Sequence, residues 1–157
     1  MYGIIATWRM ALEGIQKADS MLKNEENAAD SIEEAIKAVE DFEYYKSVGY
    51  GGLPNEEMEV ELDAAFMDGD TLEFGCVGGI KDFANPVSIA RSLMHYDVNN
   101  FLVGTGAEKY ASRHGFERKT MLTDRAKIHY HNRTKEIVNT ELKPYSGHDT
   151  VGMVCLD

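Results

Sequence analysis

A run of alternating apolar and polar residues in the middle of the chain predicts a β-hairpin. Apolar side chains stand at every second position from residue 60 to residue 66, and a second β-rich run covers residues 72–77. Asp68, Gly69 and Asp70 separate the two runs, and these residue types favour tight turns. Asp68 and Asp70 lack the later glutamate of a calcium-binding loop, so a turn is sufficient to explain them. An apolar strand face must be covered, so the hairpin demands at least one further layer.

Amphipathic helices surround the hairpin in the sequence. Residues 10–23 carry apolar side chains at helical spacing, namely Ala11, Ile15, Ala18 and Leu22. A second helix is expected to begin near Asp30 or Ser31, with a buried stripe of Ile32, Ala35, Ile36, Val39 and Phe42. Asn85 is a suitable cap before the proline that opens a helix expected over residues 86–95. Two more helices are expected over residues 107–114 and 123–134.

Short β-rich runs at residues 2–7, 101–103 and 150–156 predict three further strands. Glycines and a proline make residues 47–55 a loop. Strands and helices in this order favour an α+β layered sandwich over a simple βαβ series. No repeat or linker divides the chain.

Charge and composition exclude several classes of partner. The net charge of −11 over 157 residues argues against a nucleic-acid or anionic-membrane partner. No apolar run approaches the roughly 18 to 20 residues of a membrane-spanning helix. The N-terminus does not resemble a secretory signal, so we expect a cytoplasmic location, and Cys76 and Cys155 are predicted to be thiols.

The triplet His148, Asp149 and Thr150 carries the strongest chemical signal. An Asp-Thr pair alone usually indicates a turn followed by a strand. A threonine hydroxyl is a weak nucleophile unless a base lies beside it. If the bond before Thr150 is cut, the new α-amine becomes that base, because its pKa of about 7.7 to 8.0 is close to working pH. In the uncut chain the same hydroxyl can attack the Asp149 carbonyl, and the Asp149 carboxyl is placed to assist.

Residues 148–154, HDTVGMV, resemble the autoprocessing junction of the glycosylasparaginases. Related isoaspartyl peptidases and plant-type asparaginases more often have GTVGAVA at this place. Residues 48–69, 85–94 and 101–111 resemble segments of the same family in the same order, and the ATW at residues 6–8 resembles the end of its N-terminal strand. Arg9 and Met58 depart from the family pattern, which has a proline and a glycine there.

The resemblance implies an N-terminal-nucleophile hydrolase with a four-layer αββα sandwich, of which this chain would supply roughly the N-terminal half. Residues 1–149 would be an α-subunit-like segment, and residues 150–157 the start of a β-subunit exposed by cleavage between Asp149 and Thr150. It also implies hydrolysis of β-aspartyl amides through a covalent ester on Thr150. Trp8 would line the substrate pocket, although a tryptophan at a strand end is by itself more often a core residue.

Three functions remain open on the sequence. The first is an amidohydrolase of N-acetylglucosaminyl-asparagine, the second a β-aspartyl peptidase or L-asparaginase, and the third a truncated, non-catalytic α-subunit-like chain. The family's substrate clamp lies downstream of the nucleophile, so we expect the 157-residue chain alone to be inactive, with the bond before Thr150 intact. The resemblance also implies an (αβ)2 assembly with the missing β-subunit half.

No cofactor or metal is expected. The turn at residues 104–106 is too short for a dinucleotide fingerprint. His129 and His131 lie two residues apart on a predicted helix, which places them on different faces, and are interpreted as surface residues.

Overall fold

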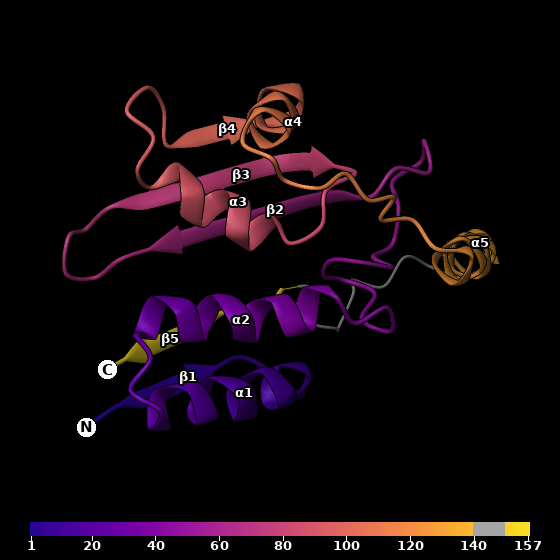
Figure 1. Cartoon of the computed structure of the whole chain (residues 1–157). Helices are drawn as coiled ribbons and strands as arrows, with labels where there is room; N and C mark the ends of the chain where they lie inside the picture. Colours follow the sequence, from indigo (N-terminus) through magenta and orange to yellow (C-terminus); the bar gives the residue numbers. More distant parts are fainter. Residues whose placement is uncertain (140–149) are drawn as a thin grey trace.

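A computed structural model describes residues 1–139 and 150–157 of the chain. The elements in order are β1 (Gly3–Ala6), the short 3-10 helix η1 (Arg9–Ala11), α1 (Leu12–Lys23), α2 (Ala28–Glu40), β2 (Glu61–Met67), β3 (Phe74–Lys81), α3 (Pro86–Leu93), β4 (Phe101–Val103), α4 (Gly104–Arg113), α5 (Asp124–Asn139) and β5 (Met153–Leu156). The α+β class expected from the sequence is confirmed, and Figure 1 shows the arrangement.

The predicted hairpin is the centre of a three-stranded sheet. β2 pairs antiparallel with β3, and β4 joins the other edge of β3 in parallel. The turn chemistry is as expected, since the Asp68 carboxylate accepts from the backbone N–H groups of Asp70 at 2.9 Å and Thr71 at 3.0 Å. β3 runs on to Lys81, beyond the predicted end, because a register shift between Leu62 and Ala64 lets Ile80 remain buried.

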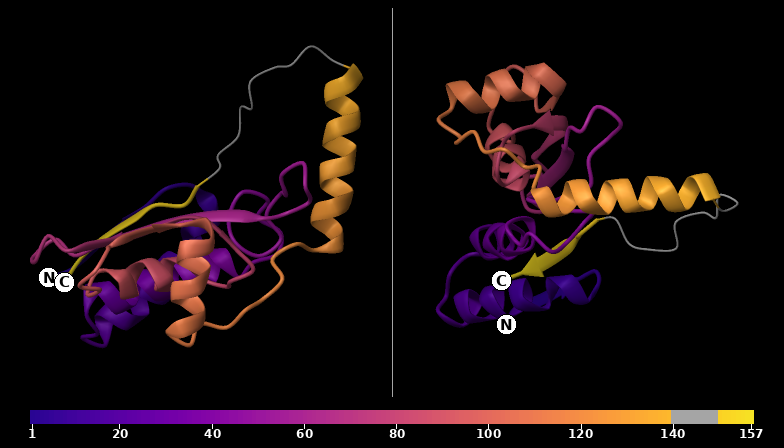
Figure 2. Two further views of the ribbon diagram at one scale, coloured as in Figure 1. Left: turned by 90° about the horizontal axis from the view of Figure 1, so that it is seen from above. Right: turned by 90° about the vertical axis from the view of Figure 1, so that its right-hand side faces the viewer.

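The strands lie along one side of the molecule and helices α1 to α4 along the other (Figure 2, left). α3 and α4 cover one face of the three-stranded sheet, while α1 and α2 lie against the pair formed by β1 and β5. α5 projects from this body in Figure 2. No helix in the described part of the chain is long and apolar enough to cross a membrane.

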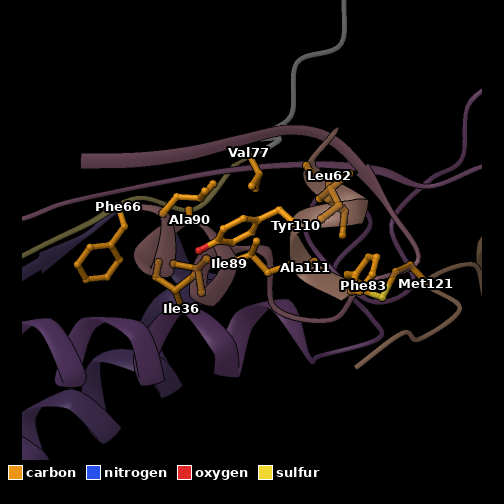
Figure 3. Packing of buried hydrophobic residues seen from close by; sticks show 14 of the residues in the cluster. Ile36, Leu62, Phe66, Val77, Phe83, Ile89, Ala90, Tyr110, Ala111 and Met121 are labelled. Carbon is orange, nitrogen blue, oxygen red and sulfur yellow. The ribbon is translucent and has the colours of Figure 1, made fainter. Parts of the chain in front are cut away.

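The main core lies between the three-stranded sheet and its helices. Tyr110 lies within this cluster, near Ile89 and Val77, and Ile36 joins it from α2 (Figure 3). Burial of these apolar side chains contributes about 25 cal/mol per Å² removed from water, which makes this cluster the principal stabilising element.

The opposite face of the strands carries exposed apolar side chains. On the three-stranded sheet these are Met67, Phe74, Phe101 and Val103, and on the β1–β5 pair they are Ile5, Val154 and Leu156. Burial alternates along the strands, so each of these residues lies on the face turned away from the helices. Exposed apolar side chains gathered on one face are typical of a surface that binds another protein segment.

Two expected helix features differ from the structure. α2 begins at Ala28, because the side chain of Asn27 accepts from the N–H of Asp30 at 2.8 Å and caps the helix ahead of the expected Asp30 or Ser31. Phe42, expected in the buried stripe, is 39% exposed because α2 has already ended at Glu40.

Packing of α1 and the start of α3 also differ from expectation. In α1, Gly14 is buried and Ile15 only half-buried, since Gly14 lies against the Ala35 carbonyl of α2. Asn85 precedes α3 but makes no capping bond with its side chain. Its amide instead donates to the carboxyl groups of Glu40 at 3.4 Å and Asp41 at 3.1 Å.

Gly75 allows the closest approach between sheet and helix. A Cβ at this position would lie 2.0 Å from the Ala90 carbonyl oxygen and 2.8 Å from the Met94 nitrogen, so Gly75→Ala must push α3 away from β3. We expect a loss of about 1 to 3 kcal/mol in the free energy of unfolding, measured by chemical denaturation. Gly69→Ala is the matched control, because nothing lies within 4 Å of its Cβ position, and it should change stability by less than about 0.5 kcal/mol.

Candidate active site

The first and last strands of the described chain pair with each other. β1 and β5 are antiparallel, with Gly3 opposite Leu156 and Ala6 opposite Met153. Thr150 precedes β5 and Trp8 follows β1, so the antiparallel register brings both residues to the same end of the pair. Figure 1 shows β1 and β5 side by side.

Thr7 and Gly152 extend this pairing toward the candidate nucleophile. The Thr7 N–H donates to the Gly152 carbonyl at 2.9 Å, and the Gly152 N–H donates to the Thr7 hydroxyl oxygen at 2.9 Å. The Thr7 hydroxyl also lies 3.4 Å from the Gly152 carbonyl oxygen, to which it donates. Gly152 is therefore held at both backbone groups by one residue, two positions after Thr150.

Thr150 is exposed at the start of this segment, as a nucleophile must be to reach a substrate. The two other predicted autoprocessing residues, His148 and Asp149, lie outside the described residues. The roles of all three stay predictions.

Trp8 has an unusual backbone for a large side chain. Its φ of 64° and ψ of 155° fall in a region that is almost restricted to glycine and costs of order 1 to 3 kcal/mol for other residues. The residue is 46% exposed, so interpreting it as a core tryptophan is wrong. Strained backbone at an exposed aromatic residue is a feature of ligand-binding sites.

A shallow hollow surrounds Trp8. Residues 8–10, at the end of β1 and the start of η1, line it, and residues 44–47, from the loop after α2, form another part of its wall. Arg9 and Lys46 bring positive charge to this hollow in a chain whose net charge is −11. The Arg125 guanidinium of α5 lies over the Tyr44 ring at 4.2 Å from the centroid, which ties α5 to the same wall. The hollow can therefore receive a small ligand that carries negative charge.

The two departures from the family pattern have backbone explanations. Arg9 occupies the first position of η1, where proline is favoured because its φ suits a helix start. Met58 has a φ of 63°, a left-handed conformation that glycine adopts without strain. Both positions thus keep the backbone that the family residues would favour, and Arg9 adds a cation beside Trp8.

Other candidate sites do not form in the described part of the chain. No group of three His, Cys, Asp or Glu side chains there is placed to hold a metal ion. His129 is half-buried and His131 exposed on α5, and Gly104 begins α4 directly after β4, a simple strand-to-helix turn. Cys76 and Cys155 are free thiols whose pKa values are raised by burial.

The match to known proteins decides the family. A family model described as asparaginase matches residues 6–157, almost the whole chain. The chain belongs to the asparaginase family. The resemblance to glycosylasparaginases and isoaspartyl peptidases found in the sequence is thereby confirmed.

Curated relatives span both branches of the asparaginase family. An N(4)-(beta-N-acetylglucosaminyl)-L-asparaginase of Elizabethkingia miricola is 34% identical over 159 residues, which cover 98% of this chain and 45% of the relative. An isoaspartyl peptidase/L-asparaginase of Rattus norvegicus is also 34% identical, covering 92% and 45%. A plant-type L-asparaginase of Thermococcus kodakarensis is 36% identical, covering 77% and 35%. The chain thus spans less than half the length of these relatives.

Sequence reasoning missed Thr7 and the wall at residues 44–47. Thr7 looked like the last residue of a strand, and nothing local shows that its hydroxyl binds Gly152 from the far end of the chain. Residues 44–47 gave no periodic pattern. Their only signal is the run of three aromatic residues Phe42, Tyr44 and Tyr45 close to Lys46.

The Thr7 hydroxyl should be needed to hold Gly152. Thr7→Val keeps the shape but leaves the Gly152 N–H without its acceptor, whereas Thr7→Ser keeps the hydroxyl. A hydrogen bond of this kind contributes about 0.5 to 1.5 kcal/mol. We therefore expect the Gly152 amide to exchange with solvent roughly 2- to 13-fold faster in Thr7→Val, and near the wild-type rate in Thr7→Ser. Unchanged exchange in Thr7→Val would show that this bond does not hold β5.

Proposed function

We propose that this chain belongs to an N-terminal-threonine amidohydrolase that cleaves β-aspartyl amides, with N-acetylglucosaminyl-asparagine as the substrate. Residues 1–149 would form the α-subunit-like segment, and residues 150–157 the start of the β-subunit. The observation that carries the proposal is the pairing of β1 with β5, which brings the exposed Thr150 to the same end of the sheet as the strained Trp8.

In the proposed self-cleavage, the Thr150 hydroxyl attacks the carbonyl carbon of Asp149. The peptide C–N bond breaks, an ester forms between Asp149 and the Thr150 oxygen, and the nitrogen becomes the α-amine of Thr150. Water then hydrolyses the ester and separates the two subunits. The Asp149 carboxyl and His148 would assist the proton transfers. Holding of Gly152 by Thr7 supports this step, because it fixes the backbone two residues beyond the scissile bond.

In the proposed turnover, the Thr150 α-amine takes the hydroxyl proton while the oxygen attacks the β-carbonyl of the substrate. The amide nitrogen leaves with a proton, and the aspartyl ester on Thr150 is hydrolysed by water to release aspartate. The donors that stabilise the oxyanion and grip the α-amino and α-carboxyl groups would come from sequence downstream of the nucleophile, as the resemblance implies.

Trp8 would line the substrate pocket. Its side chain is accessible, and it shares a hollow with the cationic side chains of Arg9 and Lys46. An aspartyl substrate carries a carboxylate, and these cations would attract it toward the pocket before the downstream residues bind it. The absence of a core role for Trp8 supports its assignment to binding.

The four-layer αββα sandwich is part of the same proposal. The exposed apolar faces of both sheets support it, because a second sheet packed there would bury Phe74, Phe101 and Val103 together with Ile5 and Val154. We propose that the β-subunit half supplies this second sheet and that two αβ units assemble. The small-molecule amide would be the only other partner.

An isoaspartyl peptidase or L-asparaginase is the second candidate, and the rat and archaeal relatives, which carry those names, favour it. The HDT-x-GM pattern at residues 148–153 favours the glycosylasparaginase branch instead. Relative kcat/KM on aspartyl-glucosamine, an isoaspartyl dipeptide and asparagine separates the two candidates. Failure to turn over all three substrates, in a protein of the relatives' length, would favour the non-catalytic alternative.

Thr150 should be needed for both reactions. In a protein of the relatives' length, Thr150→Ala removes the hydroxyl that serves both reactions, so we expect neither self-cleavage nor amidase activity, measured by intact mass and by release of aspartate. Thr150→Ser should retain part of both, since the hydroxyl survives but loses the methyl group that restricts its rotamer. Cleavage before residue 150 in Thr150→Ala would disprove the assignment.

Trp8 should matter for substrate more than for stability. Trp8→Phe keeps an aromatic ring but removes contact area from the hollow, so we expect KM to rise by about 10-fold, the equivalent of roughly 1.4 kcal/mol. The melting temperature should change little, because Trp8 is not buried. Unchanged kinetics with a large fall in melting temperature would instead assign Trp8 a structural role.

A further inference from the structure

Glu40 is a buried carboxyl group at a junction of several elements. It is the last residue of α2 and only 4% exposed. One carboxyl oxygen accepts from the backbone N–H of Val87 at 3.2 Å, in the first turn of α3, and the other accepts from the Asn85 amide at 3.4 Å. Because Asn85 makes no capping bond itself, Glu40 caps α3 from a different helix.

The backbone of Glu40 closes the loop that follows it. The Tyr50 N–H donates to the Glu40 carbonyl at 2.7 Å. Gly49 lies so close that a Cβ there would stand 2.1 Å from the same oxygen. Residues 41–50 therefore leave α2 at Glu40 and return to it.

This loop carries the wall of the hollow at residues 44–47, beside Trp8. Within the loop the Phe42 and Tyr45 rings pack in a tilted arrangement with centroids 4.8 Å apart, and just beyond it the Leu53 N–H donates to the Lys46 carbonyl at 2.8 Å. Arg125 holds Tyr44 from α5, and Glu40 holds both ends of the loop, so a displacement of Glu40 would displace residues 44–47.

We infer that Glu40 is a positioning residue: by joining the end of α2, both ends of the loop and the start of α3, it sets the position of the wall at residues 44–47 relative to Trp8. That this wall belongs to a substrate pocket rests on the proposed function. The mechanical link from Glu40 to Trp8 does not. As a consequence, a change of charge on Glu40 alters the surroundings of the Trp8 indole.

The surroundings of Glu40 make its charge sensitive to pH. Burial raises the pKa of Glu40 to about 8, the bonds from Asn85 and Val87 oppose this, and the nearby Asp41 and Glu33 add to it. The cations on the packed elements have other partners: Arg91 of α3 pairs with Glu33 and Asp30, and the Lys119 ammonium lies over the Tyr50 ring at 4.1 Å. No described ion pair neutralises Glu40.

The direction in which pH changes stability follows from the pKa values of Glu40 in the folded and unfolded protein. The folded-state pKa lies above the unfolded value of 4.5, so the stabilising contribution is complete below pH 4.5 and is lost as pH rises toward 8. Above that pH the carboxylate is a buried, unpaired charge that is drawn toward water. To reach water, the carboxylate would have to leave Asn85 and Val87 and shift the end of α2, and the loop that leaves and returns at Glu40 would then move relative to Trp8.

Fluorine NMR of 5-fluorotryptophan tests the inference, since Trp8 is the single tryptophan among the 157 residues. The experiment uses the Thr150→Ala background, so that no new α-amine titrates beside Trp8, and Trp8→Phe identifies the signal. From about pH 6 to about pH 10 the Trp8 resonance should shift in one step with a midpoint near 8. Glu40→Gln should abolish the step and hold the signal at its low-pH position.

Glu34→Gln is the matched control, because Glu34 lies on the same helix but pairs on the surface with Lys17 and Lys37, each at 2.5 Å. It should leave the step unchanged. A step that persists in Glu40→Gln would overturn the inference. A titration of the protein with Glu40 intact that shows no step near pH 8 would also overturn it, and this outcome does not depend on whether Glu40→Gln folds.

Burial lowers the pKa of His129 and raises those of both cysteines, so none of these groups titrates at the same midpoint. The fluorine NMR shift of Trp8 can be measured without amidase activity, so this inference and the proposed function can each be disproved without the other.

Discussion

The antiparallel pairing of β1 with β5 is the contact on which the site depends. It joins residues from the two ends of the described chain, and Thr7 extends it by binding both backbone groups of Gly152. The pair brings Thr150 and Trp8 to the same edge, and α2 contacts both β5 and η1 beside it. The sheet formed by β1 and β5 has only two strands, and isolated two-stranded ribbons are marginally stable in water. Its packing against α1 and α2 provides the support that the pair lacks by itself.

The uncovered strand faces support the proposed packing of a second sheet against them. Ile5, Val154 and Leu156 are each about 70% exposed or more, and they alternate with half-buried residues that face the helices. This pattern is typical of strands that are covered on both faces. The relatives exceed this chain in length by more than a factor of two, so their fold includes material that could cover these faces.

Local patterns predicted the elements well, and long-range contacts escaped them. The hairpin followed from its period of two and from the Asp68 turn, both of which are set by neighbouring residues. The start of α2 was misplaced because Asn27 and Asp30 are both good caps, and only the Asn27 side chain makes the bond. The burial of Glu40 was not predicted, since glutamate is rarely buried and its partners Asn85 and Val87 lie 45 and 47 residues away. Thr7 was missed for the same reason, its partner being 145 residues distant.

Hydrogen bonds on both sides of Trp8 hold its backbone in an unfavourable conformation. A backbone with φ of 64° and ψ of 155° relaxes unless both of its neighbours are fixed. On one side Thr7 is bound to Gly152, and on the other the Ala11 N–H donates to the Trp8 carbonyl at 3.2 Å while Ala11 itself is fully buried in the core. The indole gains little burial in return, since it stays 46% exposed, so core packing does not compensate for the strain. What the conformation does provide is the turn from β1 into η1 that places Trp8 and Arg9 in the hollow that the loop held by Glu40 also lines.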